Sequence, residues 1–245
     1  MTPHKKPIGE NGPLRVSQEA GRTKIDWQRI QYSPEKSKQE RSIADSFITA
    51  LNAEQNQDWK LTQLEENDFD FQIEQPREKR YLELQEIIIP GKKHGSPYVT
   101  GEQVIQPSKF AKTIIAAIVS KSVRYPTTGT QPLDLLNYVT HWRFRPNDTV
   151  IKLVVHGLTS ITHPFSRIYF YERIDAPTGL IKVLYPNPEL IRGFAPNPQQ
   201  EGRYLNFDPA SASPTNKEGN VGVTFRLSSD AMKKLGLGKN TGSEG

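Results

Sequence analysis

The sequence predicts an α/β protein with a single core. Two helical segments, the first amphipathic and the second mostly apolar, are separated by three short segments that alternate apolar and polar residues as strands do. Further strand-like segments follow the second helix. This order is typical of a mixed sheet flanked by helices. The 245 residues include no cysteine, which excludes disulfides and thiolate metal sites.

The two ends of the chain are poor in large apolar side chains. Residues 1–32 mix Lys, Arg, Gly, Pro and Gln, and residues 228–245 have a similar composition. Such segments bury too little apolar surface to offset the entropy lost on ordering. We therefore expect a flexible basic arm at 1–32, a single domain at 33–227 and a flexible tail at 228–245.

The first helix is expected to begin at Ser33-Pro34-Glu35, because Ser is a frequent N-cap and Pro is favoured at the first helical position. It should end at about Asn52. Its apolar residues form one stripe, namely Ile43, Ala44, Phe47, Ile48 and Leu51. Glu40 lies on or beside this stripe, which is an unusual position for a carboxylate.

Three strands are expected next, at Trp59–Leu64, Asp68–Glu74 and Arg80–Ile89, with a hairpin loop at 76–79 between the last two. The two-residue period places Asp68 and Asp70 on one face of the second strand.

The same period places Glu83 and Gln85 together on one face of the third strand. A register that pairs this face with that of Asp70 brings the carboxylates together. Carboxylate oxygens are the ligands that Mg²⁺ prefers. Such an ion beside a phosphodiester polarises the phosphoryl group and activates a water. The alternative is that these residues form only the solvated face of a hairpin.

A second helix is expected from Pro107 to about Arg124, after a loop rich in Gly, Lys and Pro. It is apolar on nearly every side, which indicates burial. The strands expected after it are Leu133–Trp142, Thr149–Leu158 and Phe165–Glu172, with weaker ones at Leu180–Leu184 and Val221–Leu227. Residues 186–212 are rich in Pro, Asn and Gly and are expected to be irregular.

The combination of Glu40 on the first helix, Asp70 at a strand start and Glu83-Leu84-Gln85 on the next strand resembles the PD-(D/E)XK nuclease superfamily. The resemblance covers residues 33–158. It implies the restriction-endonuclease-like fold, in which a mixed sheet flanked by helices has an α-β-β-β-α-β core, here with extra C-terminal strands. It also implies hydrolysis of nucleic-acid phosphodiester bonds, with DNA favoured over RNA.

The resemblance further implies a cofactor and roles for the matching residues. Mg²⁺ or Mn²⁺ would be held by Asp70 and Glu83, with the carbonyl of Leu84 assisting. Glu40 would support the metal from the helix, and Gln85 would orient the attacking water. A homodimer would suit the cutting of both strands of a duplex.

The family's lysine is replaced here by Gln85, which can orient a water but supplies no charge. A lysine from elsewhere is an alternative. Lys79, Lys109 and Lys112 are the candidates, and the sequence does not choose among them.

Basic residues supply the expected contacts to nucleic acid. The net charge is +5. Lys109 and Lys112 begin the second helix, and Arg143 and Arg145 lie in a run that interleaves Arg with aromatic rings. The alternative, without a contact to nucleic acid, is that the arginines are ordinary surface residues and the aromatic rings belong to the core.

The histidines at 141, 156 and 163 match no metal-binding spacing. His141 and His156 fall in expected strands, where we expect them to be hydrogen-bonded sheet residues. No run approaches the ~20 apolar residues that span a bilayer, and the first residues lack the apolar stretch of a secretory signal. These features favour a cytoplasmic protein without a membrane partner.

Two rival functions remain open. The first is a catalytically inactive nuclease-like domain that binds nucleic acid or a partner protein. The observation that supports it is the absence of the family's lysine. The second is a structural or interaction module whose polar hairpin face has no chemical role.

Overall fold

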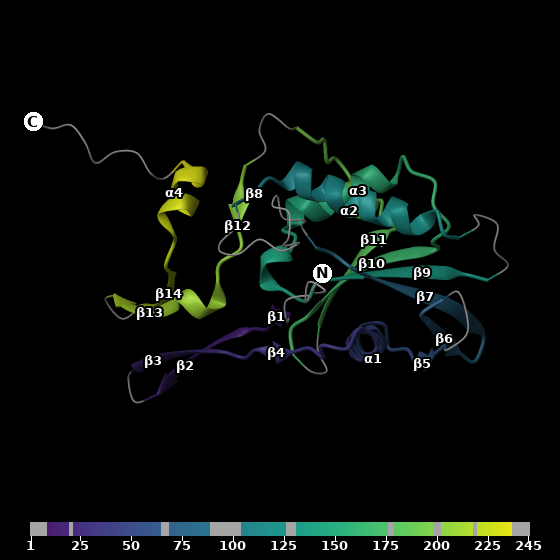
Figure 1. The fold of residues 1–245 in the computed structure, drawn as a ribbon, viewed down its shortest axis with the longest axis horizontal. Coiled ribbons are helices and arrows are strands. Elements are labelled where there is room, and N and C mark those ends of the chain that lie inside the picture. Colours follow the sequence, from purple (N-terminus) through teal and green to yellow (C-terminus); the bar gives the residue numbers. More distant parts are fainter. Residues whose placement is uncertain are drawn as a thin grey trace, which may run out of the picture.

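The computed structural model describes residues 9–19, 22–64, 69–88, 104–125, 131–175, 179–197, 202–217 and 220–236. Its centre is a six-stranded mixed sheet with strand order β11-β10-β9-β7-β6-β5. Helix α1 (Lys36–Gln55) covers one face, and α2 (Pro107–Ser122) and α3 (Asp148–Leu158) cover the other (Figure 1). The predicted α/β class, a mixed sheet flanked by helices, is confirmed.

The strands of the sheet are β5 (Lys60–Gln63), β6 (Phe71–Gln75), β7 (Glu78–Glu86), β9 (Leu133–Tyr138), β10 (Arg167–Arg173) and β11 (Gly179–Tyr185). β5, β6 and β7 form an antiparallel meander. β9 is parallel to β7, and β10 is parallel to β9. Parallel neighbours need a crossover connection, which α2 and α3 supply in turn. β11 returns antiparallel to β10 at the edge.

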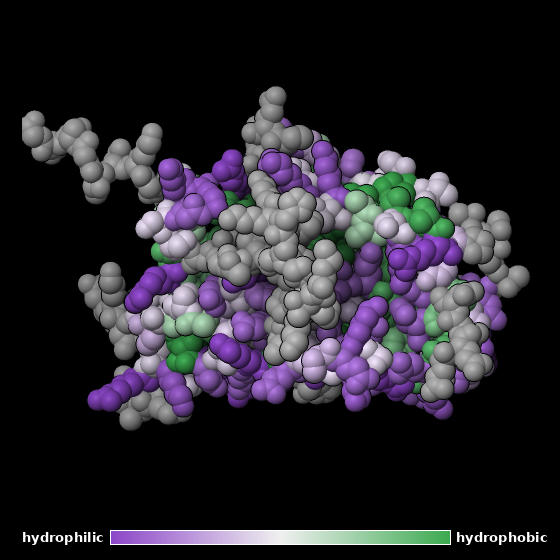
Figure 2. Space-filling model, in the orientation of Figure 1, coloured by the Kyte–Doolittle hydropathy of each residue, from purple (hydrophilic) through white to green (hydrophobic). Residues whose placement is uncertain are grey.

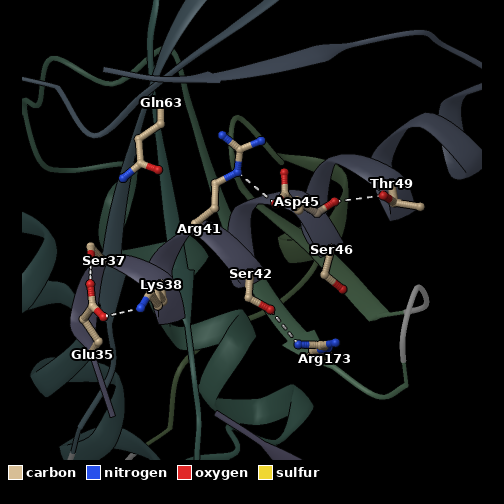
Figure 3. A pocket seen from close by; sticks show the side chains of 10 residues that line it. All are labelled: Glu35, Ser37, Lys38, Arg41, Ser42, Asp45, Ser46, Thr49, Gln63 and Arg173. Carbon is tan, nitrogen blue, oxygen red and sulfur yellow. Dashed lines mark hydrogen bonds and ion pairs between the residues drawn. The ribbon is translucent and has the colours of Figure 1, made fainter. Parts of the chain in front are cut away.

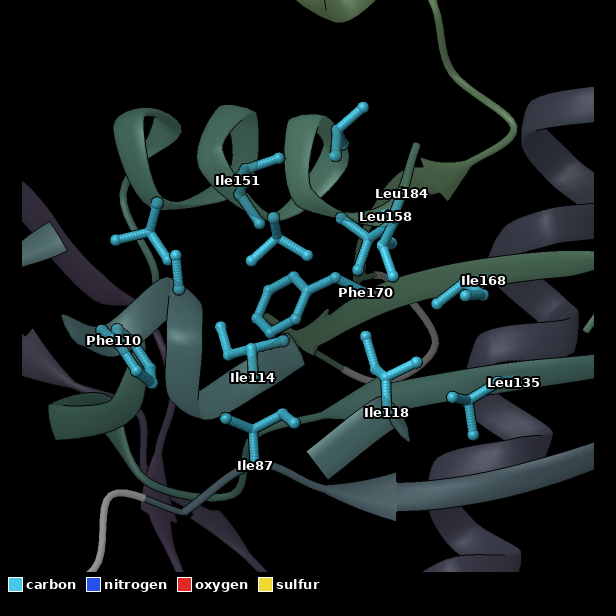
Figure 4. Close-up of a cluster of buried hydrophobic side chains, with 14 of the residues drawn as sticks. Ile87, Phe110, Ile114, Ile118, Leu135, Ile151, Leu158, Ile168, Phe170 and Leu184 are labelled. Atoms are coloured by element: carbon cyan, nitrogen blue, oxygen red, sulfur yellow. The ribbon is translucent and has the colours of Figure 1, made fainter. Parts of the chain in front are cut away.

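Both faces of the sheet are packed. Every residue of the central strand β9 is buried, as expected for a strand covered by helices on both sides. Between α1 and the sheet, Phe47 packs against the rings of Tyr169 and Tyr171 at centroid distances of 5.2 and 5.6 Å. On the other face, Ile114 and Ile118 of α2 meet the apolar side chains of α3 and β10 (Figure 4).

The strand predicted at Thr149–Leu158 is wrong, because this segment is the helix α3. Its β-branched residues favour strands, but Val150, Ile151, Val154, Val155 and Leu158 are buried with helical spacing. Asn147 is the N-cap, and its side chain accepts a hydrogen bond from the amide of Val150 at 2.9 Å. The strand predicted at Leu133–Trp142 is also shorter, since β9 ends at Tyr138 and the 3₁₀ helix η1 (Trp142–Phe144) follows.

The described parts of the expected N-terminal arm form strands instead of an extended flexible segment. They are β1 (Glu10–Asn11), β2 (Leu14–Glu19), β3 (Arg22–Trp27) and β4 (Ile30–Gln31). β2 and β3 form a hairpin, and β1 pairs with β4. Arg145 donates to the buried side chain of Asn11 at 2.5 Å, which ties this segment to the core.

The C-terminal region likewise contains more regular structure than its composition predicts. Its elements are η2 (Glu189–Ile191), β12 (Tyr204–Leu205), η3 (Pro209–Ser211), β13 (Ala212–Lys217), β14 (Asn220–Phe225) and α4 (Ser229–Leu235). β12 pairs with β8 (Val104–Ile105), a short strand before α2, and β13 pairs with β14. Ser228 caps α4 by accepting from the amide of Ala231, so part of the expected tail is helical.

The face of the molecule in Figure 2 is mainly hydrophilic, with smaller hydrophobic areas between the polar side chains. Among the residues that the structure describes, no helix is long and apolar enough to cross a membrane.

A buried ion pair joins two strands of the sheet and leads to a prediction about stability. Arg80 in β7 contacts Asp134 in β9 at 2.7 Å, and Asp134 is fully buried. Burial raises the pKa of Asp134 to about 6, and the positive charges of Arg80 and Arg167 oppose this. We expect Arg80→Met to lower the free energy of unfolding by about 3–5 kcal/mol at pH 8, because a buried carboxylate loses its cation. Urea unfolding measures the change.

The control is Arg77→Met, whose side chain is exposed in the turn before β7. It should alter stability by less than about 0.5 kcal/mol. Equal urea midpoints for the two variants would show that the ion pair has no such role.

Candidate functional site

The register of β6 and β7 brings two acidic side chains together. Phe71 pairs with Leu82, so Asp70, just before β6, lies opposite Glu83 of β7. The amide of Asp70 donates to Glu83 Oε1 at 2.9 Å, and the amide of Leu84 donates to Asp70 Oδ2 at 2.8 Å. Backbone groups therefore fix both carboxylates, and the structure places these two predicted site residues next to each other.

A lysine from α2 lies between these carboxylates. Lys121 Nζ is 2.5 Å from Glu83 Oε2 and 3.9 Å from Asp70 Oδ2. The Glu83 side chain is 2% exposed and that of Lys121 14%, whereas Asp70 is 33% exposed and opens the cluster to solvent. We call Asp70, Glu83 and Lys121 the charged cluster.

Lys121 is not one of the three lysines that the sequence suggested. Lys79, Lys109 and Lys112 are all exposed. Lys112 precedes Lys121 by nine residues, which is about 13 Å along a helix. Lys79 pairs with Glu74 in the register of β6 and β7, four residues before Glu83. The sequence places Lys121 near the end of a helix, but gives no information on which turn of that helix faces β7.

Glu40 reaches the same region from the buried side of α1, as its position on the apolar stripe predicts. Its side chain is 14% exposed and lies 3.4 Å from Lys36 Nζ. Burial raises the pKa of Glu40; Lys36 opposes the rise, Asp70 adds to it, and Lys121 opposes it. The charges of Asp70 and Lys121 therefore both act on the pKa of Glu40.

The environment of Glu83 combines burial with a compensating cation. Burial raises its pKa, the hydrogen bond from Lys121 lowers it, and the negative charge of Asp70 raises it again. The Tyr125 hydroxyl also donates to Glu83. Burial and the adjoining Glu83 raise the pKa of Tyr125, so that hydroxyl stays protonated and remains a donor. Among the described residues, the Lys121 ammonium group thus balances the charge of the buried Glu83 carboxylate.

Gln85 holds the strand of Glu83 against the helix of Lys121. Its Nε2 donates to the backbone carbonyl of Ala117 at 2.9 Å, and Ala117 lies one helical turn before Lys121. Its Oε1 is buried and has no hydrogen-bond partner among the described residues. The amide therefore contacts α2, and its role in orienting a water stays a prediction.

The two carboxylates of the charged cluster are ligands of the kind that a hard divalent cation prefers. Within the described part of the chain, no group of three or more His, Cys, Asp or Glu side chains is arranged to hold a metal ion. Asp70 and Glu83 supply two carboxylates, and Mg²⁺ is commonly held by one or two carboxylates with water and phosphate as further ligands. The structure puts the Lys121 ammonium between these oxygens. Asp68 lies outside the described residues.

The two arginines predicted to contact nucleic acid are placed by contacts within the protein. Arg145 forms an ion pair with Glu172 and donates to Asn11. The Arg143 guanidinium lies over the Trp142 ring at 5.0 Å from its centroid. Both lie where η1 meets the N-terminal strands, apart from the charged cluster. Their contact with nucleic acid stays a prediction.

His141 leads to a prediction about pH. Its Nδ1 accepts from the amide of Arg143 at 3.2 Å, and burial lowers its pKa to about 4. Below pH ~6.5 the unfolded chain binds a proton at this position that the folded chain does not, so stability falls between pH 6.5 and 4. Over this pH range, the free energy of unfolding of His141→Asn should fall by on the order of 2 kcal/mol less than that of wild type. This difference is smaller than the full pKa shift of His141 implies, because solvent reaches part of the ring.

The measurement is urea unfolding at several pH values between 7 and 4, beside His156→Asn. His156 is exposed on α3, not in the strand that the sequence predicts, and serves as the control. Parallel stability curves for wild type and His141→Asn would contradict the prediction.

A pocket along the exposed side of α1 is separate from the charged cluster (Figure 3). Its charged groups already have partners: Lys38 with Glu35 at 2.7 Å and Arg41 with Asp45 at 2.9 Å. Its lining includes neither the acidic pair nor Lys121. We therefore place the candidate site at the charged cluster.

Comparisons of the chain with protein-family models, with curated proteins and with solved structures found no match.

Proposed function

We propose that this protein hydrolyses phosphodiester bonds of nucleic acid with the help of a divalent metal ion. The observation that carries the proposal is the position of Lys121. Its ammonium group contacts Glu83 at 2.5 Å and lies 3.9 Å from Asp70, so one cation and two carboxylates converge at the start of β6. Two carboxylates can hold a metal ion that assists phosphodiester hydrolysis, and an ammonium group can stabilise the charge that develops. Here the lysine comes from a helix and not from the strand of Glu83.

The order of elements supports a restriction-endonuclease-like fold of the PD-(D/E)XK type. α1 precedes the meander β5-β6-β7, and α2 then crosses to β9, which is parallel to β7. This is the α-β-β-β-α-β order that the resemblance implies. Asp70 stands at the start of the second strand and Glu83 within the third, and Glu40 approaches from α1.

Asp70 and Glu83 would hold Mg²⁺ or Mn²⁺, which polarises the phosphoryl group and lowers the pKa of a bound water. Lys121 would donate to the attacking water and neutralise charge that develops on the phosphoryl oxygens. Glu40 would support the metal site from α1, where the negative charge of Asp70 acts on its partly buried carboxylate. Gln85 keeps α2, and with it Lys121, against β7.

Cleavage assays test the proposal directly. Purified protein is incubated with linear DNA, supercoiled DNA and RNA, each in Mg²⁺, Mn²⁺ or EDTA. We expect cleavage in the presence of the metal ions and none in EDTA, with DNA the favoured polymer. Folded protein that cuts no substrate with either ion would contradict the proposal.

A second candidate function is a catalytically inactive domain that binds nucleic acid or a partner protein. The ion pair of Lys121 with Glu83 favours it, because the pair already satisfies the acidic site without a metal ion. Such a domain would bind nucleic acid with a steep salt dependence and show no turnover. A purely structural module would bind neither nucleic acid nor Mn²⁺, and titration calorimetry with Mn²⁺ distinguishes it.

A further inference from the structure

Three aromatic rings stack in a row beside the charged cluster. Phe69 and Tyr81 are 4.2 Å apart with planes at 13°, and Phe69 and Tyr125 are 5.5 Å apart with planes at 16°. We call Tyr81, Phe69 and Tyr125 the aromatic row. All three rings are partly exposed, although the neighbouring Phe71 is only 1% exposed. The row is therefore at the surface of the core and not inside it.

The row has a buried end and an open end. Beyond Tyr125 lies Phe165, which is 3% exposed and meets Tyr125 edge-on at 6.3 Å. At the other end, no further ring among the described residues stacks on Tyr81. A planar group that extends the row would thus add at Tyr81 or along its exposed edge.

Each ring is tied to a residue of the charged cluster. Phe69 directly precedes Asp70, and Tyr81 lies two residues before Glu83 on the same side of β7. The Tyr125 hydroxyl donates to Glu83, and Tyr125 follows Lys121 by four residues. The row therefore forms a wall of the site, within reach of a nucleotide whose phosphate lies at the carboxylates.

We propose that the substrate of this site is single-stranded nucleic acid, in which a base beside the scissile phosphate stacks on the aromatic row. This inference rests on the proposed function and deepens it. Bases in a duplex are already stacked on one another, so they present no free face to a protein ring. An unpaired base does, and stacking on aromatic side chains is the usual means of holding single strands.

The charges around the site agree with this substrate. Duplex binding draws mainly on many Lys and Arg contacts to phosphates. Here the cations nearest the acidic residues are engaged, Lys121 with Glu83 and Lys36 with Glu40. Stacking supplies attraction that does not depend on further cations.

The test is binding in EDTA, where no cleavage occurs, of a short DNA with 2-aminopurine at one position. The strand is used alone and annealed to its complement, and an RNA of the same sequence forms a separate arm. We expect the single strand to bind at least tenfold more tightly than the duplex, with quenching of the fluorescent base. Phe69→Leu and Tyr81→Leu should each weaken single-strand binding by roughly tenfold.

One variant serves as the control. Phe207→Leu removes a ring that is 43% exposed and stacks on Phe225, outside the aromatic row, and should leave binding unchanged. Circular dichroism checks that each variant is folded. Because Phe69→Leu and Tyr81→Leu are tested separately, the test still stands if one of them does not fold.

The outcomes separate this inference from the proposed function. Equal affinity for single strand and duplex, or undiminished binding by both folded row variants, overturns the inference. If duplex DNA is nonetheless cut in Mn²⁺, the nuclease proposal stands without it. If no substrate is cut but single strands bind through the row, the hydrolytic function fails and the binding preference stands.

Discussion

Lys121→Met is expected to lower the rate of nucleic-acid cleavage by roughly 10²- to 10³-fold, the effect of removing one group that stabilises charge in the transition state. Lys121 is the lysine whose ammonium group contacts Glu83 in the described part of the chain, and its side chain is largely shielded from solvent. Substrate affinity should change much less than the rate, because a single phosphate contact contributes little to binding. Single-turnover kinetics in Mn²⁺ measure both quantities.

Lys60→Met is the matched control, because Lys60 is an exposed lysine in β5. Its cleavage rate should stay within about twofold of wild type, as expected for a surface substitution away from the site. Equal rates for Lys121→Met and wild type would show that Lys121 has no part in the reaction.

A second substitution in the Lys121→Met background tests the geometry of the role. Gln85 lies two residues after Glu83 on the same side of β7 and contacts α2 one turn before Lys121. A lysine introduced at this position would point toward the space that the Lys121 side chain leaves. We expect Gln85→Lys to restore at least about tenfold of the lost rate, because a positive charge again faces the acidic pair. No recovery in the folded double variant would mean that Lys121 acts from its helix in a way that position 85 cannot replace.

Glu83→Gln is expected to lower cleavage by roughly 10³-fold or more, since a metal ion contributes several kcal/mol to charge stabilisation and each 1.4 kcal/mol is tenfold in rate. Glu83 accepts from the amide of Asp70 and pairs with Lys121, so it organises the site, and in the proposed mechanism it would also be a metal ligand. Mn²⁺ affinity measured by calorimetry should fall in parallel. An amide keeps the size of the side chain, which limits the change in packing.

Glu74→Gln provides the comparison, because Glu74 is an exposed carboxylate in β6. It should retain wild-type cleavage and Mn²⁺ affinity. If Glu83→Gln is folded, by circular dichroism and thermal unfolding, and still cleaves at the wild-type rate, Glu83 is not a ligand of the catalytic metal.

The parts of the fold that follow from local sequence patterns were predicted well. The apolar stripe identifies α1, and the alternation of residues identifies β5, β6 and β7. The predicted start of α1 is wrong, because its N-cap is Glu35, without a side-chain cap, and not Ser33. The same alternation predicts that Asp70 and Glu83 share a face, and the hairpin register then places them opposite each other. These features depend on neighbours in the sequence or on one short hairpin, so a single sequence contains them.

Other features depend on packing that the sequence does not show. Lys121 reaches Glu83 only because the crossover from β7 to β9 lays the last turns of α2 over the middle of β7. The terminal strands depend on each other and on contacts such as that of Arg145 with Asn11. The strand predicted over α3 is wrong because the β-branched residues of this segment favour strands. In the structure the side chain of Asn147 caps a helix there.

In the proposed mechanism, Asp70 and Glu83 would hold a metal ion that drives phosphodiester hydrolysis. The most direct test of this role is a time course of cleavage of circular single-stranded DNA and supercoiled plasmid in Mn²⁺, with wild type beside Asp70→Asn. Asp70 is partly exposed, so this variant is expected to fold. The proposed mechanism predicts cleavage by wild type and at most a trace by Asp70→Asn or in EDTA. Intact DNA with folded wild-type protein, or equal cleavage by Asp70→Asn, would contradict it.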